Sequence, residues 1–267
     1  MVYGNNGYVG KHLIVDLVGC QGKIGKLEDV LARLCQDSGA NIVAGPEFYD
    51  FKKTRTGVVV ISTSHLRLVN SGDNYHFDLF TCGKEADPNK ISPRKPQARQ
   101  YWEETFKPRE IVTYDENPRK RNIATERRIP GQEQDLDLEE LANVRSNHLF
   151  LDCAEADPKI LDDPDRLNEL LGALCPKNGS VPKYLPKKFE PQGYTGVIVS
   201  SVGSASIHTW PEHGYAALDL FRYDGRPIEI KEVLSTINGG IKSPINRIAI
   251  EPEERRCLPI PELVGSR

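Results

Sequence analysis

The chain has 267 residues, of which 38% are hydrophobic and 27% charged, and its formal net charge is −3. This length suits one large domain or two small ones, and the composition is typical of a globular protein. The small net charge gives no general attraction to nucleic acid or to an acidic membrane. The sequence has no apolar run near the roughly 20 residues of a membrane helix, and its start lacks the features of a secretory signal. We therefore expect a cytoplasmic protein with neither nucleic acid nor membrane as a partner.

The cysteines argue against a disulfide framework or a metal site. Six of them are scattered along the chain without C-x-x-C spacing, at positions 20, 35, 82, 153, 175 and 257. In a chain of this length, such a distribution predicts neither paired cysteines nor a zinc knuckle. We expect reduced thiols and no bound metal.

The sequence contains two copies of one segment, offset by roughly 140 residues, which indicates duplication and fusion rather than a solenoid array. Each copy has a short strand-like run, a long apolar run and a closing Asp-Leu-Phe stretch. The matching stretches are residues 12–16 with 148–152, 57–66 with 196–204, and 78–83 with 219–223.

The predicted elements follow the same order in both copies. A short strand precedes a helix whose apolar residues recur at i, i+3, i+4 and i+7. Two long strands joined as a hairpin come next, followed by a second helix and a last strand. The helices are predicted at 27–34, 98–105, 167–174 and 228–237, and the last strands at 110–114 and 246–250. We expect an α+β fold of two fused β/α repeats, each a mostly antiparallel sheet with helices on one face.

Four segments follow from this pattern. Residues 1–115 form the N-terminal repeat, 116–145 an exposed linker, 146–252 the C-terminal repeat and 253–267 a tail. The linker is poor in apolar residues and rich in charges. A basic stretch at 119–121 could contact nucleic acid, but a short mixed run in a connector is usually a solvated loop.

Three residues could carry chemistry, although each alone has an ordinary structural explanation. Ser64 follows the apolar run 58–61, where hydroxyl residues commonly form cross-strand hydrogen bonds. Cys82 alone is more often a small buried hydrophobe than a reactive thiol. His208 alone is more often a packed histidine than a catalyst.

The two copies differ in a complementary way at these positions. The first copy has the serine and the cysteine, and the second has Gly203 and Tyr223 at the aligned places. The second copy has His208 where the first has Val69. Two incomplete halves that would make one complete site indicate a division of labour.

Residues 206–219, SIHTWPEHGYAALD, closely resemble the signature of the S-adenosylmethionine decarboxylases of bacteria and archaea. Residues 78–83, DLFTCG, resemble the end of the same signature. Residues 10–16 resemble the opening strand of the family, and residues 160–163 the start of its first helix. The resemblance covers both halves and leaves out the linker and the tail.

In that family a serine becomes a pyruvoyl group when the chain cleaves itself. The resemblance places this serine at Ser64, with cleavage between Thr63 and Ser64. It implies that Cys82 donates a proton to the α-carbon of the product, that His208 removes the α-proton during processing, and that the Thr195 hydroxyl supports the processing intermediate. The implied cofactor is the pyruvoyl group, which acts as an electron sink when carbon dioxide leaves, and no metal is implied.

The resemblance also implies a substrate and the residues that bind it. Phe189 matches the aromatic residue that stacks on adenine, and Glu212 the carboxylate that binds the ribose hydroxyls. A core aromatic and a solvated turn residue are the ordinary alternatives for these two positions. The implied reaction is decarboxylation of S-adenosylmethionine, which supplies the aminopropyl donor for spermidine synthesis. As in the fused eukaryotic relatives, one site would be shared between the two halves.

The sequence departs from the family pattern at Thr63, in the hairpin after Ser64, where residues 67–74 are not family-like, and at Thr195, where the family usually has serine. Thr63 stands where the family has glutamate, and the spacing from Ser64 to Cys82 is two residues shorter than usual. Two alternatives therefore stay open: a pyruvoyl-dependent decarboxylase of ornithine or arginine, and a catalytically dead regulatory homologue. Pairing of the fused chain as a homodimer also stays open.

Overall fold

The computed structural model describes residues 11–52, 54–62, 64–81, 86–114, 147–176, 181–224, 226–242 and 245–250. The chain divides into two compact units, one of residues 1–50 with 54–118 and one of residues 51–53 with 119–267. We call them the first and the second unit. Within the described ranges, no helix is long and apolar enough to cross a membrane. The predicted linker 116–145 and tail 253–267 lie outside the described residues.

The first unit is built on a six-stranded sheet in which every neighbouring pair of strands is antiparallel. The strand order is β2-β3-β4-β5-β1-β6, so the first strand of the chain lies between the fifth and the sixth. The strands are β1 (Lys11–Val18), β2 (Ile42–Asp50), β3 (Arg55–Ile61), β4 (Ser64–Ser71), β5 (Asn74–Thr81) and β6 (Glu110–Tyr114).

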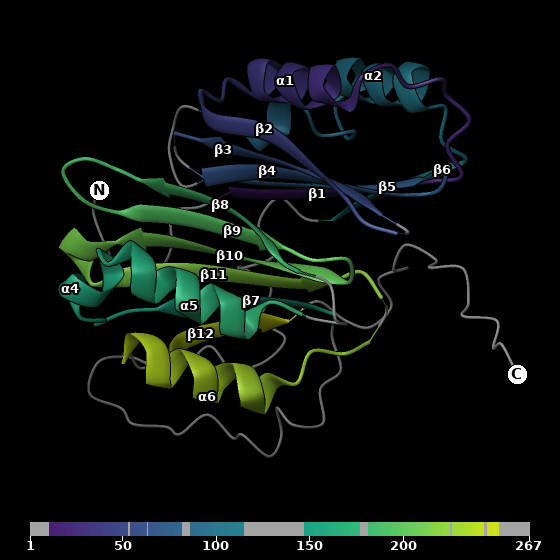
Figure 1. Cartoon of the computed structure of the whole chain (residues 1–267). Helices are drawn as coiled ribbons and strands as arrows, with labels where there is room; N and C mark the ends of the chain where they lie inside the picture. The colour runs from purple at the N-terminus through teal and green to yellow at the C-terminus, as the bar shows by residue number, and fades with distance from the viewer. Residues whose placement is uncertain are drawn as a thin grey trace, which may run out of the picture. The chain divides into compact units, whose positions relative to one another are not determined.

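Two helices, α1 (Leu27–Ser38) and α2 (Pro96–Phe106), cover one face of this sheet (Figure 1). Their apolar stripes pack with alternate strand residues into one core, because side chains on a strand point to opposite faces in turn. Trp102 and Phe106 of α2 contact Phe77 of β5 edge to face, with ring centroids 4.8 and 5.4 Å apart. A 3-10 turn, η1 (Pro88–Lys90), precedes α2.

The second unit repeats this architecture. Its six-stranded antiparallel sheet has the order β8-β9-β10-β11-β7-β12. The strands are β7 (His148–Cys153), β8 (Lys183–Lys188), β9 (Tyr194–Val199), β10 (Gly203–Trp210), β11 (Tyr215–Arg222) and β12 (Ile245–Ile250). The 3-10 turn η3 (Pro211–His213) joins β10 to β11.

The helices of the second unit are the short α4 (Pro158–Leu161), α5 (Pro164–Leu174) and α6 (Ile230–Ile241). In Figure 1, α5 and α6 lie on the same face of the sheet. The leucines of α5 and the apolar residues of α6 form the core with β9, β10 and β11. Asp163 caps α5, because its Oδ1 accepts the backbone N–H groups of Asp165 at 3.1 Å and Arg166 at 3.2 Å.

The two sheets have the same strand order when the copies are aligned, which confirms the predicted α+β fold of two β/α repeats. One detail of the prediction is wrong. The apolar run that was expected to form one long strand reverses direction between Ile61 and Ser64, and its two parts, β3 and β4, pair with each other. Ser64 therefore opens a strand instead of following one. The turn has no glycine, proline, asparagine or aspartate to mark it.

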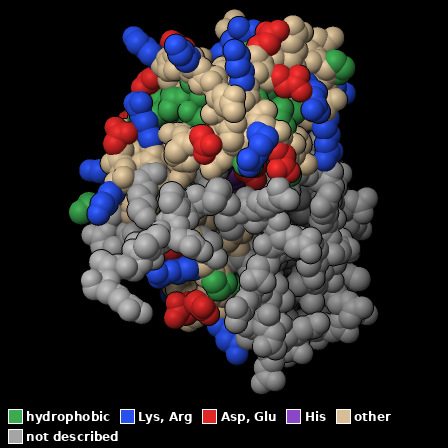
Figure 2. All heavy atoms as spheres, turned by 90° about the vertical axis from the view of Figure 1, so that its right-hand side faces the viewer, with side chains coloured by type: hydrophobic (Ala, Val, Ile, Leu, Met, Phe, Trp, Pro, Cys, Tyr) green, Lys and Arg blue, Asp and Glu red, His purple; other side chains and the backbone are tan. Residues whose placement is uncertain are grey.

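The charges on the described surface are mixed. On the face drawn in Figure 2, Lys and Arg side chains are interspersed with Asp and Glu side chains over the described residues. Exposed ion pairs of the first unit include Arg33–Asp37 on α1 and Arg99–Glu103 on α2. Pairs of this kind contribute little to stability. On this face, the described residues form no large patch of one sign.

Candidate active site

Ser64 is the first residue of β4 and sits where the chain leaves the tight turn after β3. It pairs with Ile61 across that turn and with Thr81 on β5. Its side chain is 1% exposed. The turn and the two neighbouring strands therefore hold the Ser64 hydroxyl in a water-poor environment, directly after the peptide bond that the sequence predicts to be cleaved. Thr63 itself lies outside the described residues.

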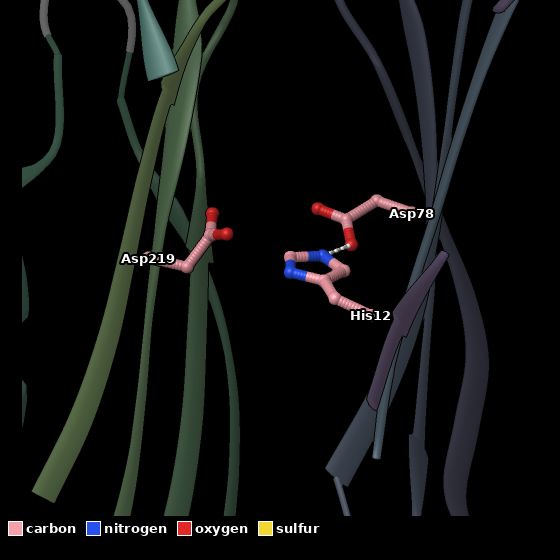
Figure 3. Close-up of side chains that lie close together, drawn as sticks. All are labelled: His12, Asp78 and Asp219. Atoms are coloured by element: carbon pink, nitrogen blue, oxygen red, sulfur yellow. Dashed lines mark hydrogen bonds and ion pairs between the residues drawn. The ribbon is translucent and has the colours of Figure 1, made fainter. Parts of the chain in front are cut away.

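Three charged residues form a buried network on the strands around β4. Asp78 of β5 accepts a hydrogen bond from His12 of β1 and another from Arg67 of β4, and all three side chains are at most 1% exposed. Figure 3 shows the His12 ring and the Asp78 carboxylate pointing toward each other. Buried charges persist only when they are paired and hydrogen-bonded, and Asp78 supplies the negative partner here.

The pKa of Asp78 is set by two opposing effects. Burial by itself raises the pKa of this carboxyl, because the charged form loses its hydration. The positive charges of His12 and Arg67, together with the hydrogen bond from His12, outweigh burial and hold the pKa of Asp78 well below its ordinary value. The network therefore keeps Asp78 ionised at neutral pH.

In the second unit, Thr195 and His208 form a hydrogen-bonded pair. They lie opposite each other on β9 and β10, and Thr195 Oγ1 is 2.9 Å from His208 Nδ1. Both side chains are buried. A hydrogen bond at Nδ1 fixes the orientation of the His208 ring.

A second buried histidine in this unit repeats a contact of the first. His148 of β7 lies 2.9 Å, Nε2 to Oδ2, from Asp219 of β11, the carboxylate that Figure 3 labels on the second sheet. His148 and Asp219 align with His12 and Asp78. The arginine has no counterpart, because Ser206 faces Asp219 across the ladder where Arg67 faces Asp78.

The two predicted substrate-binding residues lie on adjacent turns at one end of the second sheet. Phe189 directly follows β8 and is half-buried, outside the apolar core of its unit. Glu212 lies in η3, which connects β10 to β11, and is exposed. The turn after β8 touches the turn at η3, since Gln192 Nε2 donates a long hydrogen bond of 3.5 Å to Glu212 Oε2.

The sheet register shows where the first repeat is shorter. Strands β4 and β5 are joined by Gly72 and Asp73, with Ser71 opposite Asn74. The aligned strands β10 and β11 are joined by Pro211–Gly214, with Trp210 opposite Tyr215. The missing residues correspond to the turn that carries Glu212 in the second unit. Cys82 lies outside the described residues.

The S-adenosylmethionine decarboxylase family model matches residues 11–119 and 147–241, which is more than half of the chain. The chain belongs to this family. One matched segment lies almost entirely in the first unit and the other in the second, and the sheets of the two units have the same strand order.

Individual relatives match shorter parts. The S-adenosylmethionine decarboxylase proenzyme of Pyrococcus abyssi is 40% identical over 76 residues, 28% of this chain and 55% of that protein. The proenzyme of Caldanaerobacter subterraneus is 38% identical over 80 residues, 30% of this chain and 64% of that protein. The chain thus spans between half and two thirds of the length of these two relatives. A crystal structure of the adenosylmethionine decarboxylase from Aquifex aeolicus is 30% identical, covers 40% of this chain and 87% of that one, and has a TM-score of 0.31.

The sequence alone did not reveal that His12 contacts Asp78 or that His148 contacts Asp219. The signal was present in the repeat, since a histidine opens both short strand runs and an aspartate opens both Asp-Leu-Phe stretches. A polar residue that recurs at the same position of two apolar strands indicates a buried side chain with a hydrogen-bond partner. The contact around Asp162, described below, left no comparable signal.

Proposed function

We propose that this chain is a self-processing, pyruvoyl-dependent S-adenosylmethionine decarboxylase that supplies the aminopropyl donor for spermidine synthesis. The observation that carries the proposal is the Thr195–His208 hydrogen bond, which stands at positions where the first unit has Thr56 and Val69. Family membership supports the same activity.

Processing begins at the turn before β4. The Ser64 hydroxyl attacks the carbonyl carbon of Thr63, so that an ester replaces the Thr63–Ser64 peptide bond and the Ser64 nitrogen becomes a free amine. Removal of the Ser64 α-proton then breaks the Cβ–Oγ bond and releases a new carboxylate at Thr63. The dehydroalanine that remains takes up water and loses ammonia, which leaves a pyruvoyl group. The buried position of Ser64 fits this chemistry, because a water-poor site protects the ester from hydrolysis.

His208 acts as the base that removes the α-proton of Ser64. Its Nδ1 lies 2.9 Å from Thr195 Oγ1. Thr195 thereby fixes the orientation of the ring while its hydroxyl supports the intermediate. Processing therefore needs Ser64 from the first copy and His208 from the second.

Decarboxylation uses a further set of residues. The pyruvoyl carbonyl supplies the electron sink for the pair of electrons left when carbon dioxide departs. Phe189 stacks on adenine, and Glu212 accepts hydrogen bonds from the ribose hydroxyls. Cys82 returns a proton to the α-carbon.

Gel electrophoresis under denaturing conditions tests the processing step. The purified chain should give two fragments, residues 1–63 and 64–267, and Ser64→Ala should give one band. A wild-type chain that stays in one piece contradicts the pyruvoyl mechanism and supports the regulatory homologue. Mass spectrometry of the larger fragment should show a blocked N-terminus.

Release of labelled carbon dioxide tests the substrate. The processed protein is incubated with carboxyl-labelled S-adenosylmethionine, ornithine or arginine at equal concentrations. We expect release from S-adenosylmethionine alone. Release from ornithine or arginine without release from S-adenosylmethionine would replace the proposed substrate and keep the pyruvoyl chemistry.

A further inference from the structure

The turn that carries Phe189 is closed by its own backbone and needs a glycine. Phe189 N donates to Gly193 O at 2.9 Å, which folds residues 189–193 back on themselves. Gly193 has φ +105°, a conformation that other residues rarely adopt, and a Cβ there would lie 3.2 Å from the Thr209 carbonyl. The turn therefore packs closely against the end of β10.

One carboxylate outside the turn holds both of its ends. Asp162 lies between α4 and α5, and its Oδ1 accepts the Gly193 N–H at 2.9 Å. The same oxygen accepts a hydrogen bond from Lys188 Nζ, the residue directly before Phe189. Lys188 Nζ also donates to the Asp162 carbonyl at 2.8 Å. Asp162 thus bridges the chain on either side of Phe189 through three hydrogen bonds.

The turn also reaches the second predicted substrate residue. Gln192, the residue before Gly193, donates to the Glu212 carboxylate. The segment that carries Phe189 and is held by Asp162 therefore also contacts Glu212. The charge-assisted bonds to Lys188 and Gly193 also hold the pKa of Asp162 below its ordinary value, so the carboxylate is ionised at neutral pH.

We propose that Asp162 is a positioning residue for the nucleoside part of the substrate. It acts through Lys188 and Gly193 to fix the turn that presents Phe189 and, through Gln192, Glu212. This inference rests on the proposed function, because it assigns a role to the site that would bind adenine and ribose. Asp162 touches no reacting atom, so it should set substrate affinity and leave the chemical steps unchanged.

The test compares Asp162→Ala and Asp162→Asn with the control Asp163→Ala. Asp163 is the neighbouring aspartate, and it caps α5 without contacting the turn. Each variant is assayed for self-cleavage, for thermal stability, for kcat and KM with S-adenosylmethionine, and for binding of methylthioadenosine, the nucleoside part without the amino acid. Binding is measured by calorimetry on the unprocessed Ser64→Ala chain, which separates affinity from catalysis.

Without Asp162, the turn should hold Phe189 against adenine and Glu212 against ribose less firmly. We therefore expect Asp162→Ala to raise KM and the Kd of methylthioadenosine by roughly three- to tenfold. The values of kcat and the rate of self-cleavage should stay within about twofold of wild type. Asp162→Asn keeps an oxygen for the Gly193 N–H and should show a smaller rise. Asp163→Ala should lower thermal stability and leave KM unchanged.

Two results with the variants would overturn the proposal. One is a wild-type KM and Kd in Asp162→Ala; the other is an equal rise in Asp163→Ala, which would make the effect one of general stability. Failure of the proposed function looks different. If the wild-type chain binds methylthioadenosine but does not decarboxylate S-adenosylmethionine, the Asp162 variants still test the turn through their Kd. A wild-type chain that does not bind methylthioadenosine overturns this proposal together with the nucleoside site.

Discussion

Thr195 and His208 face each other across β9 and β10, with 2.9 Å between Oγ1 and Nδ1. At the aligned positions of the first unit, Thr56 faces Val69 across β3 and β4. Thr56 is 0% exposed, and its hydroxyl has no hydrogen-bond partner among the described residues. The same place in the two sheets therefore holds a polar pair in one unit and an unmatched hydroxyl in the other.

This contrast allows one substitution to be tested at two matched positions. Thr195→Val removes the hydrogen bond to His208 at nearly constant volume and should slow self-cleavage roughly tenfold, the equivalent of one lost hydrogen bond. Thr195→Ser should restore the rate, since it restores the hydroxyl. The rate is followed by gel electrophoresis of freshly synthesised chain.

Thr56→Val is the control for this experiment and a prediction in itself. Replacing a buried hydroxyl that has no partner should leave the free energy of unfolding unchanged or raise it by up to about 1 kcal/mol. Self-cleavage should proceed at the wild-type rate. Equal slowing in both valine variants would show that the threonines act through strand packing instead of through His208.

His208→Ala should separate the two stages of processing. Without the base, the ester between Thr63 and Ser64 can form but the α-proton stays in place. The chain should therefore remain whole in buffer and split when it is treated with hydroxylamine, which cleaves esters and spares peptide bonds. Ser64→Ala, which forms no ester, should resist the same treatment. A His208→Ala chain that cleaves at the wild-type rate would assign the base to another residue.

Much of this arrangement follows from the repeat. Matching apolar runs predicted matching strands and helices, and both sheets have the same order, because the same spacing of elements folds in the same way. The turn between β3 and β4 was missed because the apolar pattern continues into β4 through residues that do not favour turns. The contacts of Asp78 and Asp162 were missed for another reason. They join residues far apart in sequence, and no local pattern determines which polar groups meet.

Asp78→Asn should strongly destabilise the first unit. The amide cannot balance the charge of Arg67, which would remain buried without its negative partner. Breaking a buried ion pair from one side costs about 3–5 kcal/mol. Urea unfolding of the Ser64→Ala chain, with and without Asp78→Asn, measures the difference on one uncleaved polypeptide. A change below about 1 kcal/mol would mean that water reaches the network.

The stabilisation from Asp78 should disappear in acid. Its pKa is depressed in the folded chain, so its contribution is fully present above the pKa of an unfolded aspartate and is lost as the pH falls toward the folded pKa. The free energy of unfolding of the chain with Asp78 should exceed that of the Asp78→Asn chain by roughly 1.4 kcal/mol less for each pH unit below about 4. Unfolding curves at pH 5, 4 and 3 test this. A difference between the two chains that grows in acid would mean that folding raises the pKa of Asp78 instead of lowering it.

Gly203, the residue aligned with Ser64, should not accept a serine. A Cβ at this position would lie 2.5 Å from the Phe221 carbonyl oxygen and 2.6 Å from Pro176 Cγ, so backbone would have to move. Gly203→Ser should therefore destabilise the second unit by about 1–3 kcal/mol. Gly239→Ser is the control, because a Cβ there meets nothing within 4 Å.

The turn before Gly203 is also held in a way that opposes cleavage. Ser200 Oγ accepts the N–H groups of Val202 and Gly203 at 3.2 Å each and donates to the Pro176 carbonyl at 2.5 Å. These bonds tie the turn to the end of α5, and the aligned residue in the first unit, Ile61, has no side-chain group that could make them. The Ser64→Ala chain that also carries Gly203→Ser should therefore stay in one piece. Cleavage before residue 203 would show that a serine at this turn is sufficient, and that the second repeat lost only the nucleophile.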